Sequence, residues 1–242
     1  MVVDRGTGAV LTIRVVGETG STNADLLAVA ATGAEEGLWL RAERQTAGRG
    51  RLGRGWADGR GNLFASTIVR LRPQDPAAPM LTLVAAVALA DAVADLLPGL
   101  VTLKWPNDLM VGDAKLSGIL LERSGDAVVI GFGVNLASHP DLPDRATTSL
   151  AAQGVTVAPE TLLSGLAERF AAWLAIWRQG DVSTVRTGWE ERAHPVGTPL
   201  RVRLPDGGER SGRFGGLDAD GALRLIDDDG RTVTVHAGDV SA

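Results

Sequence analysis

The chain has 242 residues, 45% hydrophobic and 22% charged, a balance that is typical of a globular protein and excludes extensive disorder. Its 24 basic and 29 acidic side chains give a net charge of −5, which excludes a protein that coats nucleic acid over its whole surface and leaves room only for a local basic site. The absence of cysteine excludes disulfides, thiolate metal sites and a cysteine nucleophile, and the lack of a signal peptide or an uninterrupted membrane-length apolar run predicts a cytoplasmic protein without membrane contact.

Hydrophobic periodicity divides the first three quarters of the chain into regular elements. Period-two alternation or short apolar runs predict strands at residues 9–16, 37–43, 62–71, 100–105, 114–122 and 127–136. Helical spacing with capping residues and glycine or proline stops predicts helices at residues 21–33, 79–99 and 158–180. The last helix carries an apolar stripe that we expect to pack in the core, formed by Leu162, Leu166, Phe170, Trp173, Leu174 and Trp177.

The pattern changes near Val196 to short strands separated by recurrent turn signals. The sequences DGG, DADG and DDDG lie too close together for helices and predict a small all-β, barrel-like domain. The acidic turns lack the full ligand pattern of an EF-hand, so we interpret them as hairpin turns. We therefore predict an α+β fold with a domain at residues 1–192 and a second, all-β domain at residues 193–242.

Arginines and glycines are concentrated between two predicted strands. Residues 41–56 read RAERQTAGRGRLGRGW, a stretch whose arginines repel one another unless an anion lies between them. Backbone amides at the glycines and guanidinium groups together can bind a phosphate or a carboxylate. The stretch contains no Walker motif, and its place between strands of an acidic protein argues against an RNA-binding RG tract.

Lysine is almost absent, which draws attention to the positions where it remains. Of the 24 basic residues only Lys104 and Lys115 are lysines, and both lie in the stretch LKWPNDLMVGDAKLSGILLE. A compact ammonium group on a flexible stem is not replaceable by guanidinium, so a retained lysine is a candidate functional residue.

Two further residues each allow two roles. Trp56, which ends the arginine loop, either covers a ligand or buries the next strand. Asp108 is either a magnesium ligand or a turn residue.

The order of five motifs resembles one family. STN at 21–23, QTAGRGRLGR at 45–54, KWPND at 104–108, KLSGIL at 115–120 and GFGVN at 131–135 resemble the catalytic domain of the bacterial biotin protein ligases. The resemblance implies a mixed-sheet catalytic domain of the biotin/lipoate ligase type followed by an SH3-like barrel. It also implies ATP-dependent formation of biotinyl-5′-AMP and transfer of biotin to a lysine of a biotin carboxyl carrier domain.

The resemblance assigns roles to residues of this chain. It implies biotin binding by Ser21, Thr22, Asn23, Gln45, Arg49, Arg51, Lys115 and Gly118. It implies ATP or adenylate binding by Arg49, Arg51, Arg54, Trp56, Lys115, Gly131, Gly133 and Asn135, with Lys115 and Arg51 catalytic. Ser21 and Thr22 fit helix capping as well. Magnesium is implied as the companion of ATP, with Asp108 as its candidate ligand.

The same residues argue against two alternatives, a lipoate or octanoate enzyme and a ligase that also binds DNA. A lipoate or octanoate ligase or transferase belongs to the same superfamily but lacks a GRGRxGR loop, so this loop favours biotin. Only about twenty residues precede the STN motif, and they contain no basic helix-turn-helix, so we expect a monofunctional ligase that does not bind DNA.

Overall fold

The computed structural model describes residues 2–3 and 11–241. The chain forms two compact units, the first from Met1–Gln74 and Asp113–Glu168 and the second from Asp75–Gly112 and Arg169–Ala242. Each unit combines two separate stretches of the chain. The units therefore do not coincide with the sequential domains 1–192 and 193–242, whose boundary stays a prediction.

A mixed β-sheet forms the centre of the first unit. Its strands follow the order β1-β2-β3-β4-β8-β7, with bounds Val2–Val3, Leu11–Thr19, Leu38–Gln45, Leu63–Arg70, Ala127–Val134 and Ala114–Ser124. Strands β2 and β3 are parallel, because helix α1 connects them, whereas the other neighbours are antiparallel. The predicted mixed sheet is confirmed.

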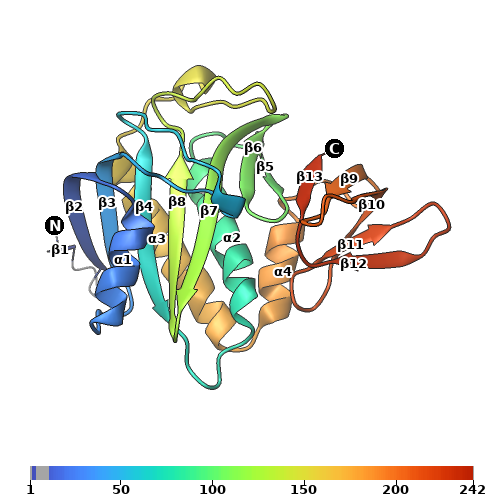
Figure 1. The fold of residues 1–242 in the computed structure, drawn as a ribbon, viewed down its shortest axis with the longest axis horizontal. Helices are drawn as coiled ribbons and strands as arrows, with labels where there is room; N and C mark the ends of the chain where they lie inside the picture. The colour runs from blue at the N-terminus through green and yellow to red at the C-terminus, as the bar shows by residue number, and fades with distance from the viewer. Residues whose placement is uncertain (1, 4–10, 242) are drawn as a thin grey trace. The chain divides into compact units, whose positions relative to one another are not determined.

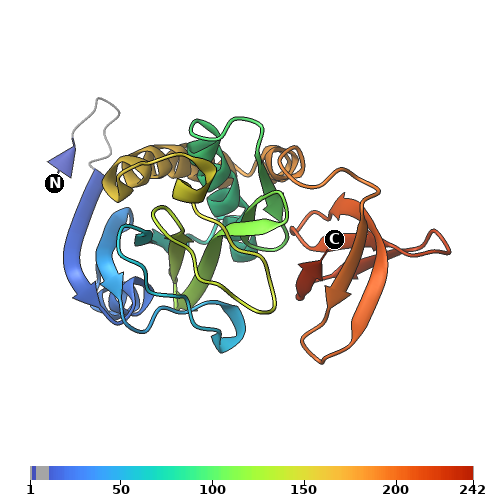
Figure 2. The same cartoon turned by 90° about the horizontal axis from the view of Figure 1, so that it is seen from above.

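Helix α1, Thr22–Ala31, covers one face of this sheet. Figures 1 and 2 show it lying against the strands, and its apolar side chains form a buried cluster with strand residues. The cluster contains Leu26, Ala30, Leu38, Leu40, Ile68, Ala127 and Val129. Strands β4 and β8 are buried along nearly their whole length, and in β4 the buried residues include the polar Ser66 and Thr67.

The second unit contains helices, an antiparallel strand pair and a five-stranded antiparallel sheet. Helix α2, Leu81–Ala94, is almost entirely buried, and a hairpin follows it, formed by β5, Val101–Lys104, and β6, Asp108–Val111. Five strands form the predicted all-β region in the order β12-β11-β10-β9-β13, with bounds Thr232–Val235, Leu223–Ile226, Glu209–Leu217, Pro199–Arg203 and Asp239–Ser241. This all-β prediction is confirmed.

Two elements differ from the sequence prediction. Helix α4, Val182–Glu190, was not predicted, since its nine residues include threonines and a glycine; Asp181 caps it by accepting from the Thr184 amide at 3.1 Å. Asp108, expected in a turn, opens strand β6 and pairs with Lys104. Three 3₁₀ segments, Arg51–Gly53, Ala78–Met80 and Ala151–Gln153, complete the local structure.

Helix α3, Pro159–Arg178, runs from the first unit into the second. Four residues of its predicted core stripe are buried, namely Leu162, Leu166, Phe170 and Trp177. Trp173 is half-buried, and its Nε1 donates to Asp91 Oδ2 of α2 at 2.9 Å; Asp91 Oδ1 accepts from Arg192 Nε at 2.8 Å. Asp91 therefore links three segments of the second unit. No helix in the described part of the chain is both long and apolar enough to span a membrane.

Candidate active site

A buried polar cluster lies where α1 begins beside β3 and β4. Thr22, Asn23, Gln45 and Ser66 are each at most 8% exposed. Gln45 Oε1 accepts from the Thr22 amide at 2.8 Å and lies 3.0 Å from Thr22 Oγ1, which is itself 2.7 Å from Ser66 Oγ. Ser66 Oγ donates to Asn23 Oδ1 at 2.6 Å. These four uncharged side chains therefore satisfy one another's hydrogen bonds inside the fold.

Asn23 continues this cluster to strands β7 and β8. Its Nδ2 donates to Glu122 Oε2 at 2.8 Å and to the Leu120 carbonyl at 3.3 Å. A Cβ on Gly131 would lie 2.3 Å from Asn23 Oδ1, so only glycine permits this approach. Ser66 and Gly131 are partners in the β4–β8 register, which explains why Asn23 contacts both.

Ser21 has the capping role that its sequence allows. It is the N-cap of α1, with an extended backbone, and its Oγ accepts from the Ala24 amide at 3.4 Å. Its side chain is 6% exposed. Ser21 therefore fixes the start of the helix that presents Thr22 and Asn23.

The arginine-glycine loop folds back on itself. The Trp56 amide donates to the Gly48 carbonyl at 2.9 Å and the Gly50 amide to the Arg54 carbonyl at 2.7 Å, with Leu52 at the tip in a left-handed conformation (φ 56°). Leu52 is 70% exposed. The loop presents three arginines beside the sheet: Arg49, which is exposed, and Arg51 and Arg54, which are half-buried.

Arg44, at the base of the loop, is bound by two carboxylates. Its Nε donates to Asp58 Oδ2 at 2.6 Å and its Nη1 to Glu18 Oε2 at 2.9 Å. The hydrogen bond with Asp58, followed by that with Glu18, raises the pKa of the Arg44 guanidinium. Arg44 therefore joins the base of the loop to β2 and does not need the anion that the sequence suggested.

Trp56 and Lys115 lie over glycines of β7 and β8. A Cβ on Gly133 would lie 2.4 Å from the Trp56 ring and one on Gly118 3.0 Å from it, so both glycines make room for this side chain. Gly118 and Gly133 are partners in the β7–β8 register. Lys115 Nζ lies 5.6 Å from the centre of the Trp56 ring, a distance at which a cation is attracted to the ring face.

The backbone around Lys115 is held by the segment that follows β8. The Lys115 amide donates to the Ala146 carbonyl at 2.9 Å, and its carbonyl accepts from the Thr148 amide at 3.0 Å. Asn135 is 4% exposed and its Nδ2 donates to the Thr148 carbonyl at 3.0 Å. Asn135 thus has a structural role in holding this segment, and its predicted role in reading adenine stays a prediction.

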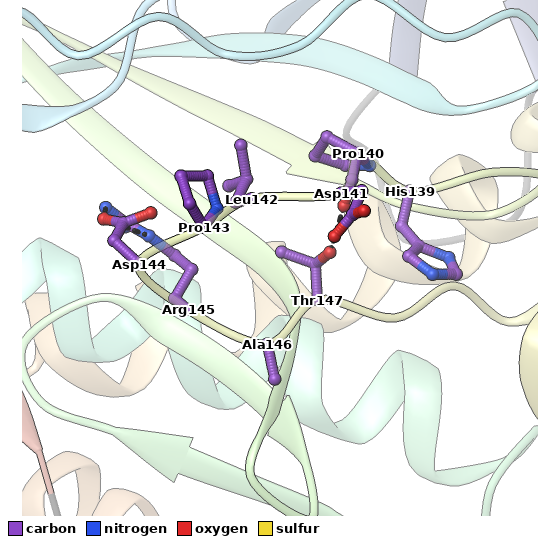
Figure 3. Close-up of a pocket in the computed structure, with 9 residues that line it drawn as sticks. All are labelled: His139, Pro140, Asp141, Leu142, Pro143, Asp144, Arg145, Ala146 and Thr147. Carbon is purple, nitrogen blue, oxygen red and sulfur yellow. Dashed lines mark hydrogen bonds and ion pairs between the residues drawn. The ribbon is translucent and has the colours of Figure 1, made fainter.

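A hollow of about 580 Å³ lies in the same segment and is lined by residues 139–147 (Figure 3). Figure 3 shows the ion pair between Asp144 and Arg145, whose atoms lie 2.6 Å apart. The Arg145 hydrogen bond is the main cause that lowers the pKa of the Asp144 carboxyl, and the charge of Arg54 lowers it further. The loop arginine is therefore electrostatically coupled to the hollow.

The structure brings most of the predicted site residues together in the first unit. Asn23, Trp56 and Lys115 lie over Gly131, Gly133 and Gly118. Asp108 belongs to the second unit, and its predicted role as a magnesium ligand stays a prediction. Within residues 2–3 and 11–241, no three histidine or carboxylate side chains group into a site that could hold a metal ion.

Three polar residues of the site were missed in the sequence. Ser66 and Glu122 complete the cluster around Asn23, and Asn62 Oδ1 accepts from three successive amides, those of Leu136, Ala137 and Ser138, at 2.9 to 3.1 Å. A polar side chain in the middle of a mostly apolar strand is the one signal that could have revealed Ser66, and Thr67 beside it carries the same signal. Asn62 carried none, since it stands at the first position of the predicted strand 62–71 and no local pattern there indicates a contact with residues 136–138.

Comparison with known proteins identifies two matching family models. Residues 17–135 match the biotin/lipoate A/B protein ligase family, and residues 199–242 match the biotin protein ligase C-terminal domain. The first match contains the polar cluster, the arginine loop and Lys115, and the second covers the all-β region.

Individual relatives agree with these models. A biotin–[acetyl-CoA-carboxylase] ligase of Mycobacterium tuberculosis is 42% identical over 93% of this chain and 87% of its own length. One from Paracoccus denitrificans is 42% identical over 90% of this chain and 96% of its own. The solved structure of a biotin protein ligase from Aquifex aeolicus in complex with biotin and ATP superposes with a TM-score of 0.82 at 25% identity, covering 95% of this chain and 97% of that one.

Proposed function

The chain belongs to the biotin protein ligases, and we propose on this basis that it activates biotin with ATP and transfers it to a biotin carboxyl carrier domain. The biotin carboxylate attacks the α-phosphorus of ATP, the bond to the pyrophosphate oxygen breaks, and biotinyl-5′-AMP and pyrophosphate form. The ε-amine of a carrier lysine then attacks the acyl carbon of this mixed anhydride. An amide bond forms, AMP leaves, and the amine loses a proton.

The buried cluster suits the ureido end of biotin. A cyclic urea is neutral and carries both donors and an acceptor, so hydroxyl and amide side chains bind it better than charges do. Thr22, Asn23 and Gln45 supply such groups at 3%, 4% and 8% exposure, respectively. We assign these three residues to biotin binding, with Ser21 holding the helix start beside them.

Lys115 suits the reacting end. Its ammonium group lies on the same face of the β7–β8 pair as Trp56, and it would neutralise the charge that develops on the phosphoryl oxygens during in-line attack. This role is electrostatic and needs no proton transfer. Gly118 keeps the strand surface beneath the ammonium group flat, since a Cβ there would lie 3.1 Å from Lys115 Nζ.

The loop suits the phosphates and the adenylate. Arg49, Arg51 and Arg54 project from a hairpin whose glycines let the backbone approach an anion. Closed over the adenylate, this loop would exclude water from a reactive anhydride. The hollow at residues 139–147 contains two aspartates, so it fits the uncharged adenosine better than the triphosphate. Magnesium enters as the counter-ion of the substrate MgATP.

One observation carries the proposal. A neutral hydrogen-bonding cluster and a cationic group lie over the same face of β7 and β8, with Asn23 above Gly131, Trp56 above Gly133 and Lys115 above Gly118. Residues two apart in a strand share a face, so one elongated ligand can contact the three side chains that lie above these glycines. Biotinyl-5′-AMP, neutral at one end and charged in the middle, is such a ligand.

The test is to incubate the protein with biotin, MgATP and a purified carrier domain and to weigh the carrier by mass spectrometry. We expect an ATP-dependent gain equal to one biotin attached through an amide. Lipoate is run in parallel, since the matched family model includes lipoate ligases. A lipoyl gain with no biotinyl gain would contradict the proposal and support the sister activity.

A further inference from the structure

We propose that Ser66, part of the buried cluster that we assign to biotin binding, is a positioning residue that makes this cluster select for N–H donors. Ser66 is 0% exposed on β4, and its Oγ contacts both Thr22 and Asn23. The inference rests on the proposed function, because it concerns how the same cluster distinguishes a urea from a ligand without N–H groups.

The orientation of the Asn23 amide is the first step. Its Nδ2 faces Glu122 Oε2 at 2.8 Å and the Leu120 carbonyl at 3.3 Å, and a carboxylate and a carbonyl oxygen only accept hydrogen bonds. The reversed amide would place an oxygen against two acceptors. Asn23 Oδ1 must therefore face Ser66, where it accepts.

The Ser66 hydroxyl must therefore donate its proton to Asn23. Ser66 Oγ lies 2.6 Å from Asn23 Oδ1, which has no proton to give, so Ser66 is the donor. In its second contact, 2.7 Å from Thr22 Oγ1, Ser66 can then only accept. Two oxygens at this distance require a proton between them, so Thr22 donates to Ser66.

The remaining oxygen–oxygen contact, between Thr22 and Gln45, therefore has no proton between its two atoms. Thr22 Oγ1 lies within donating distance of Gln45 Oε1 at 3.0 Å, but its single proton goes to the shorter contact with Ser66; Gln45 Oε1 already accepts from the Thr22 amide at 2.8 Å. Three oxygen–oxygen contacts share two hydroxyl protons, and Ser66 directs both away from Gln45. Thr22 and Gln45 thus present two adjacent acceptors, which a ligand N–H group satisfies and an ether, thioether or dithiolane does not.

The main test compares Ser66→Ala with Thr67→Val. Thr67 is also 0% exposed, is adjacent on the same strand, and donates its hydroxyl to the Leu38 carbonyl at 3.1 Å on the other face. For Ser66→Ala we expect the KM for biotin to rise about tenfold, with kcat within about twofold and an unchanged KM for ATP. Thr67→Val is expected to keep the KM for biotin of the wild type.

A ligand analogue separates positioning from packing. In a cyclic carbonate analogue of biotin, oxygen replaces each urea N–H at nearly the same size. The wild type should bind it at least about tenfold more weakly than biotin, and Ser66→Ala should discriminate less, because Thr22 is then free to turn its proton toward the ligand. Ser66→Thr, which keeps the hydroxyl, should restore discrimination.

The outcomes are separable. If the wild type does not biotinylate a carrier, the proposed function fails. If it does, but Ser66→Ala and Thr67→Val have equal KM values for biotin, or the wild type binds the carbonate as well as biotin, the role of Ser66 is wrong. Should Ser66→Ala not fold, the analogue measured on wild type alone decides.

Discussion

The polar cluster at the start of α1 and the arginine-glycine loop present opposite solutions to ligand binding. In the cluster, Thr22, Asn23, Gln45 and Ser66 are buried and bind one another before any ligand arrives. In the loop at residues 46–62, most side chains are exposed and Leu52 reaches 70% exposure. The first region is built by packing, whereas the second holds its shape through a few backbone hydrogen bonds.

This difference follows from what each region must recognise. A neutral urea is distinguished by the directions of its donors and acceptor, which requires rigid, mutually positioned partners. Phosphates are recognised by charge, which acts over longer distances and tolerates movement. The loop meets strand β7 at Trp56 and Lys115, where the Lys115 ammonium group lies 5.6 Å from the centre of the Trp56 ring. Variants can therefore separate the two tasks.

Lys115→Ala removes the charge at the meeting point and should have the largest effect. We expect biotin-dependent pyrophosphate release to fall about 10²–10³-fold, the cost of removing one preorganised group from a developing charge. Circular dichroism and the thermal midpoint should stay those of wild type. Arg231→Ala is the control, because the Arg231 side chain is 80% exposed; this variant should release pyrophosphate like the wild type. Wild-type pyrophosphate release in Lys115→Ala would show that Lys115 is not the catalytic cation.

Asn62→Ala should destabilise the fold by about 2–3 kcal/mol, because it leaves three backbone amides without their shared acceptor. Asn62→Asp keeps an acceptor oxygen and should lose less. Urea denaturation measures both. Since Asn62 joins the end of the loop to residues 136–138, the KM for ATP should rise more than that for biotin; an equal rise in both would contradict this link.

Arg51→Gly should loosen the loop without changing the buried cluster. We expect biotinyl-5′-AMP to leak from the enzyme about tenfold faster in the absence of a carrier, since one charge-assisted contact is lost. The biotin affinity measured without ATP should stay that of wild type. A variant that retained adenylate like the wild type would remove Arg51 from the loop's closing function.

Arg44→Ala should have the smallest effect. Its ion pairs with Glu18 and Asp58 are exposed, and exposed pairs contribute little to stability. We expect no measurable shift of the thermal midpoint and an unchanged leakage of adenylate. Faster leakage, on the scale of Arg51→Gly, would mean that Arg44 belongs to the anion-binding arginines after all.

The sequence predicted the elements and most of the site because these depend on local patterns. Hydrophobic periodicity located α1, α2, α3 and strands β2, β3, β4, β7 and β8, whereas β1 was not predicted; the five motifs contain Thr22, Gln45 and Lys115. Helix α4 escaped because tertiary packing of Val185 and Trp189, rather than helix propensity, stabilises it.

The missed site residues depend on contacts between distant parts of the chain. Ser66 and Asn23 are 43 positions apart, and Asn62 and Leu136 are 74 apart. Hydrophobic periodicity describes only neighbouring residues, so it cannot predict a contact between residues this far apart in the sequence. The ion pairs of Arg44 could not be predicted for the same reason, since its partners Glu18 and Asp58 approach it only once β2, β3 and the loop are assembled.

Biotin binding to Gly131→Ala tests the central claim most directly. A Cβ on Gly131 would lie 2.3 Å from Asn23 Oδ1, so an alanine must displace Asn23 from the cluster. Calorimetric titration with biotin, without ATP, isolates this region from the loop; Gly17→Ala, with no atom within 4 Å of its Cβ, is the control. We predict that Gly131→Ala loses biotin binding while Gly17→Ala binds like wild type. Wild-type affinity in a folded Gly131→Ala would show that the buried cluster does not bind biotin.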